Sequence, residues 1–85
     1  MEKKVTVVIP NYNGLRFMEP CFRALDSQAC RDFSVLVVDN GSTDGSVEWL
    51  RERGIPSVSL ETNTGFSGAV NCGIKAADTP YVILL

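Results

Sequence analysis

The chain has 85 residues, of which 45% are hydrophobic and 21% are charged, and its formal net charge is −2. This length allows one domain at most, and the composition is that of a globular protein rather than a disordered one. Ten acidic against eight basic residues argue against a nucleic-acid partner, because such proteins normally carry a basic excess.

The sequence contains no histidine, which removes Ser-His-Asp and Cys-His nucleophile pairs and His-ligated zinc. Its three cysteines, Cys21, Cys30 and Cys72, are odd in number and form no C-x-x-C pair, so we expect reduced structural thiols. The apolar run at residues 5–9 is too short for a signal peptide or a membrane span. We therefore expect a cytoplasmic protein with no membrane segment in this chain.

Apolar runs predict the strands, which are Val5–Ile9, Phe33–Val38, Ser57–Leu60 and Tyr81–Leu85. The first two and the last are nearly continuous in Val, Ile and Leu, as is typical of parallel strands that are covered on both faces. The third is the weakest, because it follows a proline and carries two serines.

Helical spacing appears between these runs. In the first interval, apolar residues recur at Leu15, Met18, Phe22 and Leu25. In the second interval, Ser46–Arg53 is predicted to be a helix with Asp44 as its N-cap. The third helix, predicted over Phe66–Ala77, is rich in glycine and alanine, which indicates close packing on a sheet or approach of a ligand.

Strands and helices that alternate in this way predict an α/β fold with right-handed parallel crossovers. We expect three layers: a four-stranded parallel sheet in the order 3-2-1-4 with helices on both faces, like one half of a Rossmann-like doubly wound domain. The fourth strand, Tyr81–Leu85, would be an unprotected edge. We expect either that the chain is a fragment of a longer protein or that this edge mediates homo-oligomerisation.

The polar loops after the first two strands are the candidate ligand site, because open α/β sheets bind ligands beyond the carboxyl ends of their strands. Asp39 would accept hydrogen bonds from a ligand or cap the turn that follows, and position alone gives the two interpretations equal weight. Tyr12 has two equally favoured interpretations as well: its ring would stack on a base or sugar, or it is simply an exposed aromatic residue of the loop.

Weaker candidates lie further along the chain. Helix capping explains residues 63–65 better than anion binding does, and Asn71 is expected to bond to the backbone of a neighbouring loop. No G-x-G-x-x-G follows the first strand, which disfavours a dinucleotide-binding domain. The run that begins at Gly68 has Walker spacing, but Ile74 and Lys75 stand where Lys and Ser/Thr are required.

Blocks of sequence in a fixed order resemble family 2 glycosyltransferases. They are Val7–Asn13 (VVIPNYN), Val37–Ser46 (VVDNGSTDGS) and Asn63–Gly73 (NTGFSGAVNCG), and Tyr81–Leu85 is similar to the family's fourth strand. The resemblance covers essentially the whole chain, and the blocks together are more specific than any one of them alone.

The resemblance implies a GT-A fold and inverting transfer of a sugar from a nucleoside diphosphate sugar to a glycan or lipid-linked acceptor, as in cell-wall or polysaccharide biosynthesis. Residues 1–85 would be the truncated N-terminal nucleotide-sugar-binding part of such a domain. Carried over residue by residue, the nucleotide-binding positions would be Pro10, Tyr12, Asp39, Asn40, Gly65, Gly68 and Asn71. Pro10 and Tyr12 would line the pocket, Asp39 would bond to the base, and the two glycines and Asn71 would shape the wall behind it.

The run Gly-Phe-Ser-Gly-Ala at residues 65–69 is similar to rhamnosyltransferase-like members, which favours a UDP- or dTDP-linked donor. The resemblance also implies a divalent metal, Mg²⁺ or Mn²⁺, for the full-length family member, held by an Asp-x-Asp type motif after the fourth strand. The sequence ends at Leu85, before such a motif, so we expect this chain alone to bind no metal, hold no catalytic residue and be inactive. Two alternatives are a non-catalytic nucleotide-binding or self-associating α/β module and an α/β domain whose loops are only turns.

Overall fold

Strands and helices alternate along the chain, as the sequence predicts. The structure is a computed structural model, and it describes residues 4–27 and 33–85. The strands are β1 (Val5–Asn11), β2 (Phe33–Asp39), β3 (Ser57–Ser59) and β4 (Tyr81–Leu84). The helices are α1 (Leu15–Asp26), α2 (Ser46–Glu52) and α3 (Gly65–Ala76).

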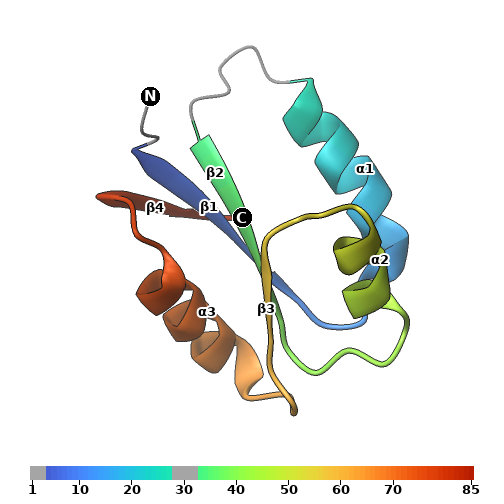
Figure 1. The fold of residues 1–85 in the computed structure, drawn as a ribbon. Coiled ribbons are helices and arrows are strands. Elements are labelled where there is room, and N and C mark those ends of the chain that lie inside the picture. The colour runs from blue at the N-terminus through green and yellow to red at the C-terminus, as the bar shows by residue number, and fades with distance from the viewer. Residues whose placement is uncertain (1–3, 28–32) are drawn as a thin grey trace.

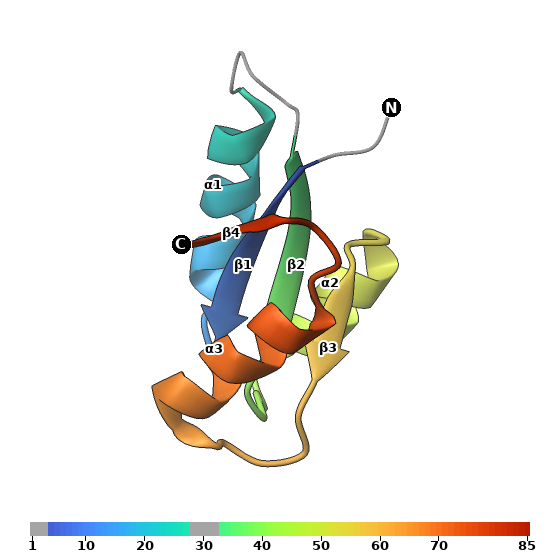
Figure 2. The same ribbon diagram turned by 90° about the vertical axis from the view of Figure 1, so that its left-hand side faces the viewer.

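The strands form one parallel sheet in the order β3-β2-β1-β4, which confirms the predicted topology. Helices α1 and α2 cover one face and α3 covers the other, so the molecule has three layers (Figures 1 and 2). Strand order reverses at β1, which pairs with β2 on one side and with β4 on the other. The carboxyl ends of β1, β2 and β3 lie at the same edge of the sheet (Figure 2).

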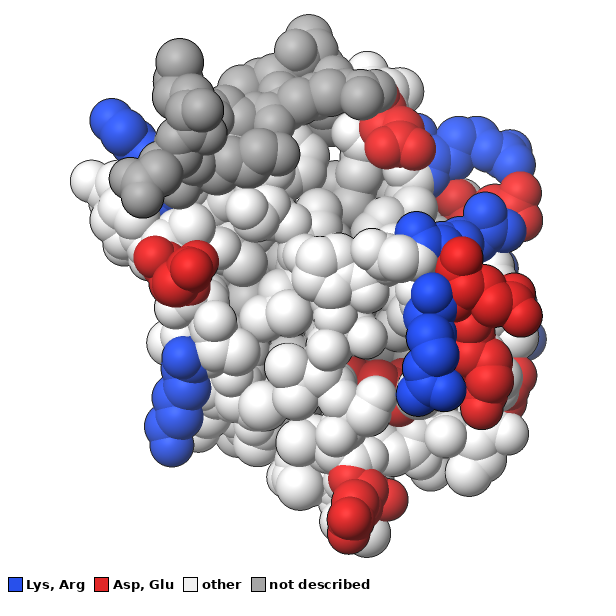
Figure 3. All heavy atoms as spheres, in the orientation of Figure 1, with Lys and Arg blue, Asp and Glu red and all other residues white. Residues whose placement is uncertain are grey.

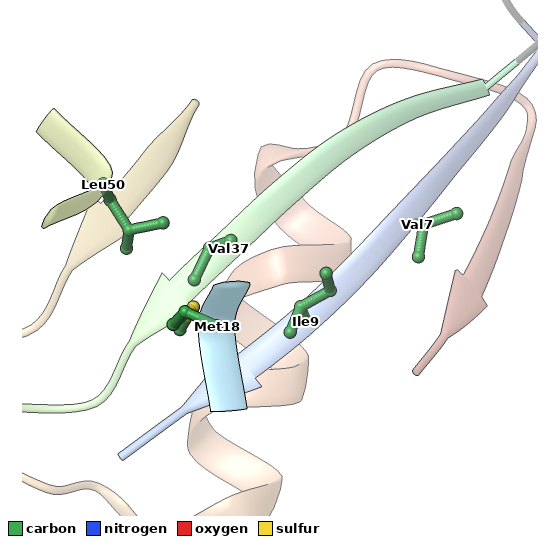
Figure 4. Packing of buried hydrophobic residues seen from close by; sticks show 5 residues of the cluster. All are labelled: Val7, Ile9, Met18, Val37 and Leu50. Atoms are coloured by element: carbon green, nitrogen blue, oxygen red, sulfur yellow. The ribbon is translucent and has the colours of Figure 1, made fainter. Parts of the chain in front are cut away.

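Successive side chains of β1 point to opposite faces of the sheet and so contribute to two cores. The core under α1 and α2 consists of Val7, Ile9, Met18, Val37 and Leu50 (Figure 4). The core under α3 consists of Val8, Val38 and Ala69. A Cβ atom at Gly73 would collide with the Val8 side chain, so this glycine lets α3 approach the sheet closely, as its composition predicts.

The ends of the elements differ slightly from the prediction, and the differences matter at the loops. β1 and β2 each continue into a polar residue, and Asn11 pairs with Asp39 in the ladder. The prediction that Asp44 is the N-cap of α2 is wrong, because Gly45 takes that position with a φ of 94°. The Asp44 carboxylate instead accepts hydrogen bonds from the backbone N–H groups of Leu15 (2.9 Å) and Ser46 (3.0 Å), at the starts of two helices.

β4 pairs with β1 and leaves every one of its residues exposed. Of the cysteines, Cys21 and Cys72 are free thiols, and Cys30 lies outside the described residues. None of the helices in residues 4–27 and 33–85 has the length and apolar character needed to cross a membrane. The cytoplasmic location expected from the sequence stays a prediction.

Candidate functional site

A crevice opens between the carboxyl ends of β1 and β2 and the start of α3. Its volume is about 250 Å³, and it is lined by Pro10, Asn11, Tyr12, Asn40, Asn63, Gly65, Phe66 and Ala69. We call this site the α3-side crevice. It lies beyond the carboxyl ends of the strands, which is where open α/β sheets bind ligands, and it borders β1, the strand at which the order reverses, on the side of β2. Its volume is below the roughly 300–1,000 Å³ of pockets for drug-sized ligands, so it suits a small ligand or one part of a larger ligand.

The segment Pro10–Tyr12 separates the crevice from a second hollow on the other face. That hollow, of about 260 Å³, is lined by the same segment together with Ile9 of β1, the α1 N-cap Gly14, and Phe17, Met18 and Cys21 of α1. Tyr12 is 53% exposed and borders both spaces, so its ring is free to lie against a flat ligand. The structure therefore brings Pro10 and Tyr12 to one site.

Asp39 does not line the crevice, because its side chain is buried under the loops. The residue is 1% exposed, and its Oδ1 accepts a hydrogen bond from Asn11 Nδ2 at 2.9 Å. Its Oδ2 accepts one from the backbone N–H of Ser42, also at 2.9 Å. The carboxylate thus ties the end of β1 to the loop after β2, and the predicted contact with a base stays a prediction.

The loop after β2 is also joined to the segment that leads into α1, by hydrogen bonds between side chains and backbone. Ser42 Oγ accepts a hydrogen bond from the backbone N–H of Asn13 (2.8 Å), and Asn13 Oδ1 accepts one from the N–H of Thr43 (2.7 Å). Asp44 adds its bond from Leu15 N–H. The Ser46 hydroxyl also donates to Asp44, and this bond, more than any other contact, holds the pKa of Asp44 below its ordinary value of 3.8.

Asn40 lies beside Asp39 and is 5% exposed. Its side chain reaches across to the loop between β3 and α3, which forms the other wall of the crevice. Nδ2 donates to Asn63 Oδ1 (2.9 Å) and to the carbonyl of Gly65 (3.1 Å). Oδ1 accepts from the backbone N–H of Thr64 (2.9 Å) and from its hydroxyl (3.1 Å). Asn40 therefore joins the crevice floor to that wall.

Gly65 lines the crevice, whereas Gly68 and Asn71 lie elsewhere on α3. They line a separate hollow of about 490 Å³ with Val58, Cys72, Lys75 and Ala76. A Cβ atom at Gly68 would lie 2.5 Å from Thr64 Oγ1, so glycine leaves room for the Thr64 side chain that bonds to Asn40. Asn71 is exposed and its side chain makes no hydrogen bond with the described residues, so its expected bond to the backbone of a neighbouring loop is wrong.

Four lining residues, Asn11, Asn63, Phe66 and Ala69, are not among the binding positions predicted from the sequence. From the sequence, Asn63 is interpreted as part of a helix cap, and Asn11 as a turn former. Phe66 is 66% exposed in the first turn of α3, and an exposed aromatic directly after a glycine is the signal that marks it. Ala69 is fully buried and carries no such signal, because a small residue on a helix face is ordinarily interpreted as a packing residue.

Larger hollows lie away from the carboxyl edge of the sheet. One, of about 640 Å³, runs between α1 and α2 over Phe22, Trp49 and Ile55 and is rimmed by charged residues of both signs. Figure 3 shows Lys or Arg and Asp or Glu side by side on the right-hand side, where Figure 1 places these helices. Another, of about 420 Å³, borders the amino end of β2. We place the functional site in the smaller crevice because it alone of these three combines loop polar groups with the strand order reversal.

A metal fits poorly in this part of the chain. Within residues 4–27 and 33–85 there is no group of three or more His, Cys, Asp or Glu side chains that could hold a metal ion. Two carboxylates at the loops, Asp39 and Asp44, each accept bonds from protein N–H groups, and Glu61, in the loop after β3, is exposed.

Comparison with known proteins agrees with the topology. The sequence model described as Glycosyl transferase family 2 matches residues 6–85. A teichoic acid poly(glycerol phosphate) polymerase of Staphylococcus epidermidis is 28% identical over 88 aligned residues, which cover 96% of this chain and 12% of the polymerase.

Solved structures are similar over nearly the whole chain. S. aureus TarS 1-349 in complex with UDP has a TM-score of 0.81 and 30% identity, and the match covers 96% of this chain and 26% of TarS. The mannosyltransferase PcManGT from Pyrobaculum calidifontis, in complex with GDP-Man and Mn²⁺, has a TM-score of 0.80 and 26% identity, covering 91% and 25% of the two chains. The chain thus spans about an eighth to a quarter of the length of these relatives.

The fold and the crevice define an α/β domain of the kind that takes its ligand at the carboxyl edge of a parallel sheet. The match over residues 6–85 then establishes that the chain belongs to glycosyl transferase family 2. Its sheet order of 3-2-1-4 with helices on both faces is the GT-A Rossmann-like arrangement of its structural neighbours.

Proposed function

We propose that this chain is the N-terminal nucleotide-sugar-binding part of an inverting glycosyltransferase. The complete enzyme would transfer a sugar from a UDP- or dTDP-linked donor to a glycan or lipid-linked acceptor, as a rhamnosyltransferase-like member would. One observation carries the proposal: the α3-side crevice combines an exposed tyrosine, a set of amide side chains and the start of a helix at the strand reversal. The family match and two relatives solved with UDP and with GDP-Man support it.

In the proposed complex, the crevice takes the nucleoside. Tyr12 would stack on the base, with Pro10 and Phe66 as apolar neighbours. The polar groups of Asn11 and Asn63 would border the ribose and the base edge. Asp39 accepts a hydrogen bond from Asn11 at 2.9 Å. It would either hold the shape of the loop or bond to the base, as the family resemblance implies.

The divalent metal of the complete enzyme has no ligand set among the residues that the structure describes. We propose that this chain binds the nucleotide and transfers no sugar on its own, because sugar transfer needs a metal or a similar cation on the diphosphate leaving group and a general base on the acceptor hydroxyl. Detectable transfer of a sugar by the purified chain would contradict this part of the proposal.

The direct test is calorimetric titration of the chain with UDP, dTDP and GDP, each with and without Mn²⁺. We expect UDP or dTDP to bind, with an affinity that Mn²⁺ changes little. Tyr12→Ala should weaken this binding about tenfold, which corresponds to the loss of one stacking contact. Tyr81→Ala is the matched control, because Tyr81 is also exposed (65%) but lies on β4. No binding of any nucleotide, or equal losses in both variants, would contradict the proposed site.

A second candidate function, self-association, is favoured by the exposure of β4. Tyr81 and Ile83 of β4 and the adjoining Leu85 are each more than half exposed, on an edge that presents unpaired backbone groups. If β4 pairs with a second copy, size-exclusion chromatography with light scattering will give a dimer, and Ile83→Lys will convert it to a monomer. A monomer at all concentrations would exclude this candidate.

A further inference from the structure

Asn40 lies at the floor of the α3-side crevice, between its two walls. One wall is the end of β1, with Pro10 and Tyr12, and the other is the loop that leads into α3, with Asn63 and Gly65. The two walls are about fifty residues apart in the sequence, and their spacing decides what fits between them.

The side-chain amide of Asn40 uses all of its hydrogen-bonding capacity on the second wall. An asparagine side chain has two N–H donors and two carbonyl lone pairs. The two donors bond to Asn63 Oδ1 (2.9 Å) and to the Gly65 carbonyl (3.1 Å), and the carbonyl accepts from Thr64 N–H (2.9 Å) and Thr64 Oγ1 (3.1 Å). All four bonds go to consecutive residues of one loop, which leaves the amide without capacity for a ligand.

The backbone of Asn40 is bonded to the first wall. Its N–H donates to the carbonyl of Asn11 at 2.8 Å, just beyond the last pair of the β1–β2 ladder. One residue therefore contacts both walls, with its backbone on β1 and its side chain on the loop before α3. Asn63, Thr64 and Gly65 are all exposed, so little other burial holds this wall in place.

We propose that Asn40 is a positioning residue that sets the width of the crevice and thereby its affinity for a nucleoside, without contacting the ligand itself. The proposal rests on the proposed function and assigns Asn40 a role different from the direct nucleotide contact expected from the sequence. Because the wall is ordered before a ligand arrives, binding does not have to supply the free energy of ordering it.

Two variants of Asn40 test this role. Asn40→Ala removes all four side-chain bonds, whereas Asn40→Asp keeps an acceptor for both groups of Thr64 but turns a carboxylate oxygen toward Asn63 Oδ1 and the Gly65 carbonyl, which are both acceptors. Calorimetric titration with UDP and dTDP should show a loss of affinity of about tenfold for alanine and at least as large a loss for aspartate, because a buried charge then repels the wall. Amide hydrogen exchange of Thr64 should accelerate in both variants.

Thr6→Ala is the matched control. Thr6 is 3% exposed and its hydroxyl bonds to the hydroxyl of Thr79 at 2.7 Å, near the amino end of β1 and away from the crevice. The variant loses a buried side-chain bond and should lower the melting temperature, yet it should bind UDP or dTDP as the unmodified chain does. Equal loss of affinity in the control would show that general destabilisation explains the Asn40 result, and would overturn the positioning role.

The remaining outcomes separate the two proposals. If the unmodified chain binds UDP or dTDP and Asn40→Ala binds it equally well, the positioning role is wrong and the proposed function stands. If affinity falls while Thr64 exchange is unchanged in both variants, Asn40 contacts the nucleotide directly and the positioning role is again wrong. If the unmodified chain binds no nucleotide, the proposed function fails, and the nucleoside role of Asn40 fails with it. Should Asn40→Ala not fold, the affinity of Asn40→Asp relative to Thr6→Ala decides.

Discussion

The loops at the carboxyl ends of β1, β2 and β3 and the edge strand β4 are held in different ways. At the loops, polar side chains are buried and bonded: Asp39 and Asn40 are 1% and 5% exposed and together make six side-chain hydrogen bonds to neighbouring loops and strand ends. β4 is joined to β1 by its backbone ladder, and its apolar side chains face solvent, with Ile83 53% exposed.

The loops therefore form a region whose polar groups are already satisfied within the chain, whereas β4 leaves apolar surface exposed to solvent. Saturated polar networks fix one arrangement of the loops, so a ligand that enters the crevice meets a site already formed. An exposed apolar edge strand is typical of surface that another chain or segment covers. We therefore expect that substitutions in β4 leave ligand binding at the crevice unchanged, and that substitutions at the crevice leave the exposure of β4 unchanged.

The largest expected effect comes from removing buried apolar surface. Leu50 is fully buried in the core under α1 and α2, and Leu50→Ala should lower the free energy of unfolding by about 2–5 kcal/mol. Leu84→Ala, on the exposed β4, removes the same atoms and should cost less than about 1 kcal/mol, because Leu84 is already 46% exposed. Urea denaturation of both variants measures the contrast. Similar losses would mean that β4 is buried in solution.

The next effect tests the polar network itself. Asp39→Ala leaves Asn11 Nδ2 without its carboxylate partner and the N–H of Ser42 without an acceptor, so the free energy of unfolding should fall by about 1–3 kcal/mol. Asp26→Ala is the control, because Asp26 is exposed at the end of α1, and it should change stability by less than about 0.5 kcal/mol. If the two variants are equally stable, the buried Asp39 network does not hold the loops.

The smallest expected effect is a shift in the titration of Asp44. The Ser46 hydroxyl, the main cause, lowers the pKa of Asp44 below 3.8, so the carboxylate stabilises the fold above its unfolded pKa and that contribution is lost as pH falls through the lower folded pKa. In Ser46→Ala the pKa should rise toward 3.8. Carboxyl ¹³C shifts recorded from pH 2 to pH 6 in both proteins measure the change, and identical midpoints would contradict the assigned cause.

Much of the fold was predictable because it depends on local patterns. The apolar runs at residues 5–9 and 33–38 and the spacing of Leu15 and Met18 predicted parallel strands and an amphipathic helix. The order of the elements then left 3-2-1-4 as the simplest sheet, which is confirmed.

The site was predictable only in part, because its bonds join residues that are far apart in the sequence. Asn63, Thr64 and Gly65 were interpreted as a helix cap, and Thr64 is indeed the N-cap of α3, while Asn63 Oδ1 accepts a hydrogen bond from the Gly65 N–H (2.7 Å). The additional bond of the Thr64 hydroxyl to the distant Asn40 could not be predicted from local sequence. The face of α3 that Asn71 occupies likewise depends on how the helix docks, which spacing alone could not show.

An amide NMR titration of the chain with UDP, dTDP and GDP tests the central claim most directly. We expect saturable shifts of amide signals with UDP or dTDP, concentrated at Tyr12, Asn40 and Gly65, whereas the signals of β4 residues such as Ile83 do not shift. A well-dispersed spectrum that none of the three nucleotides changes, or shifts confined to β4, would contradict the claim.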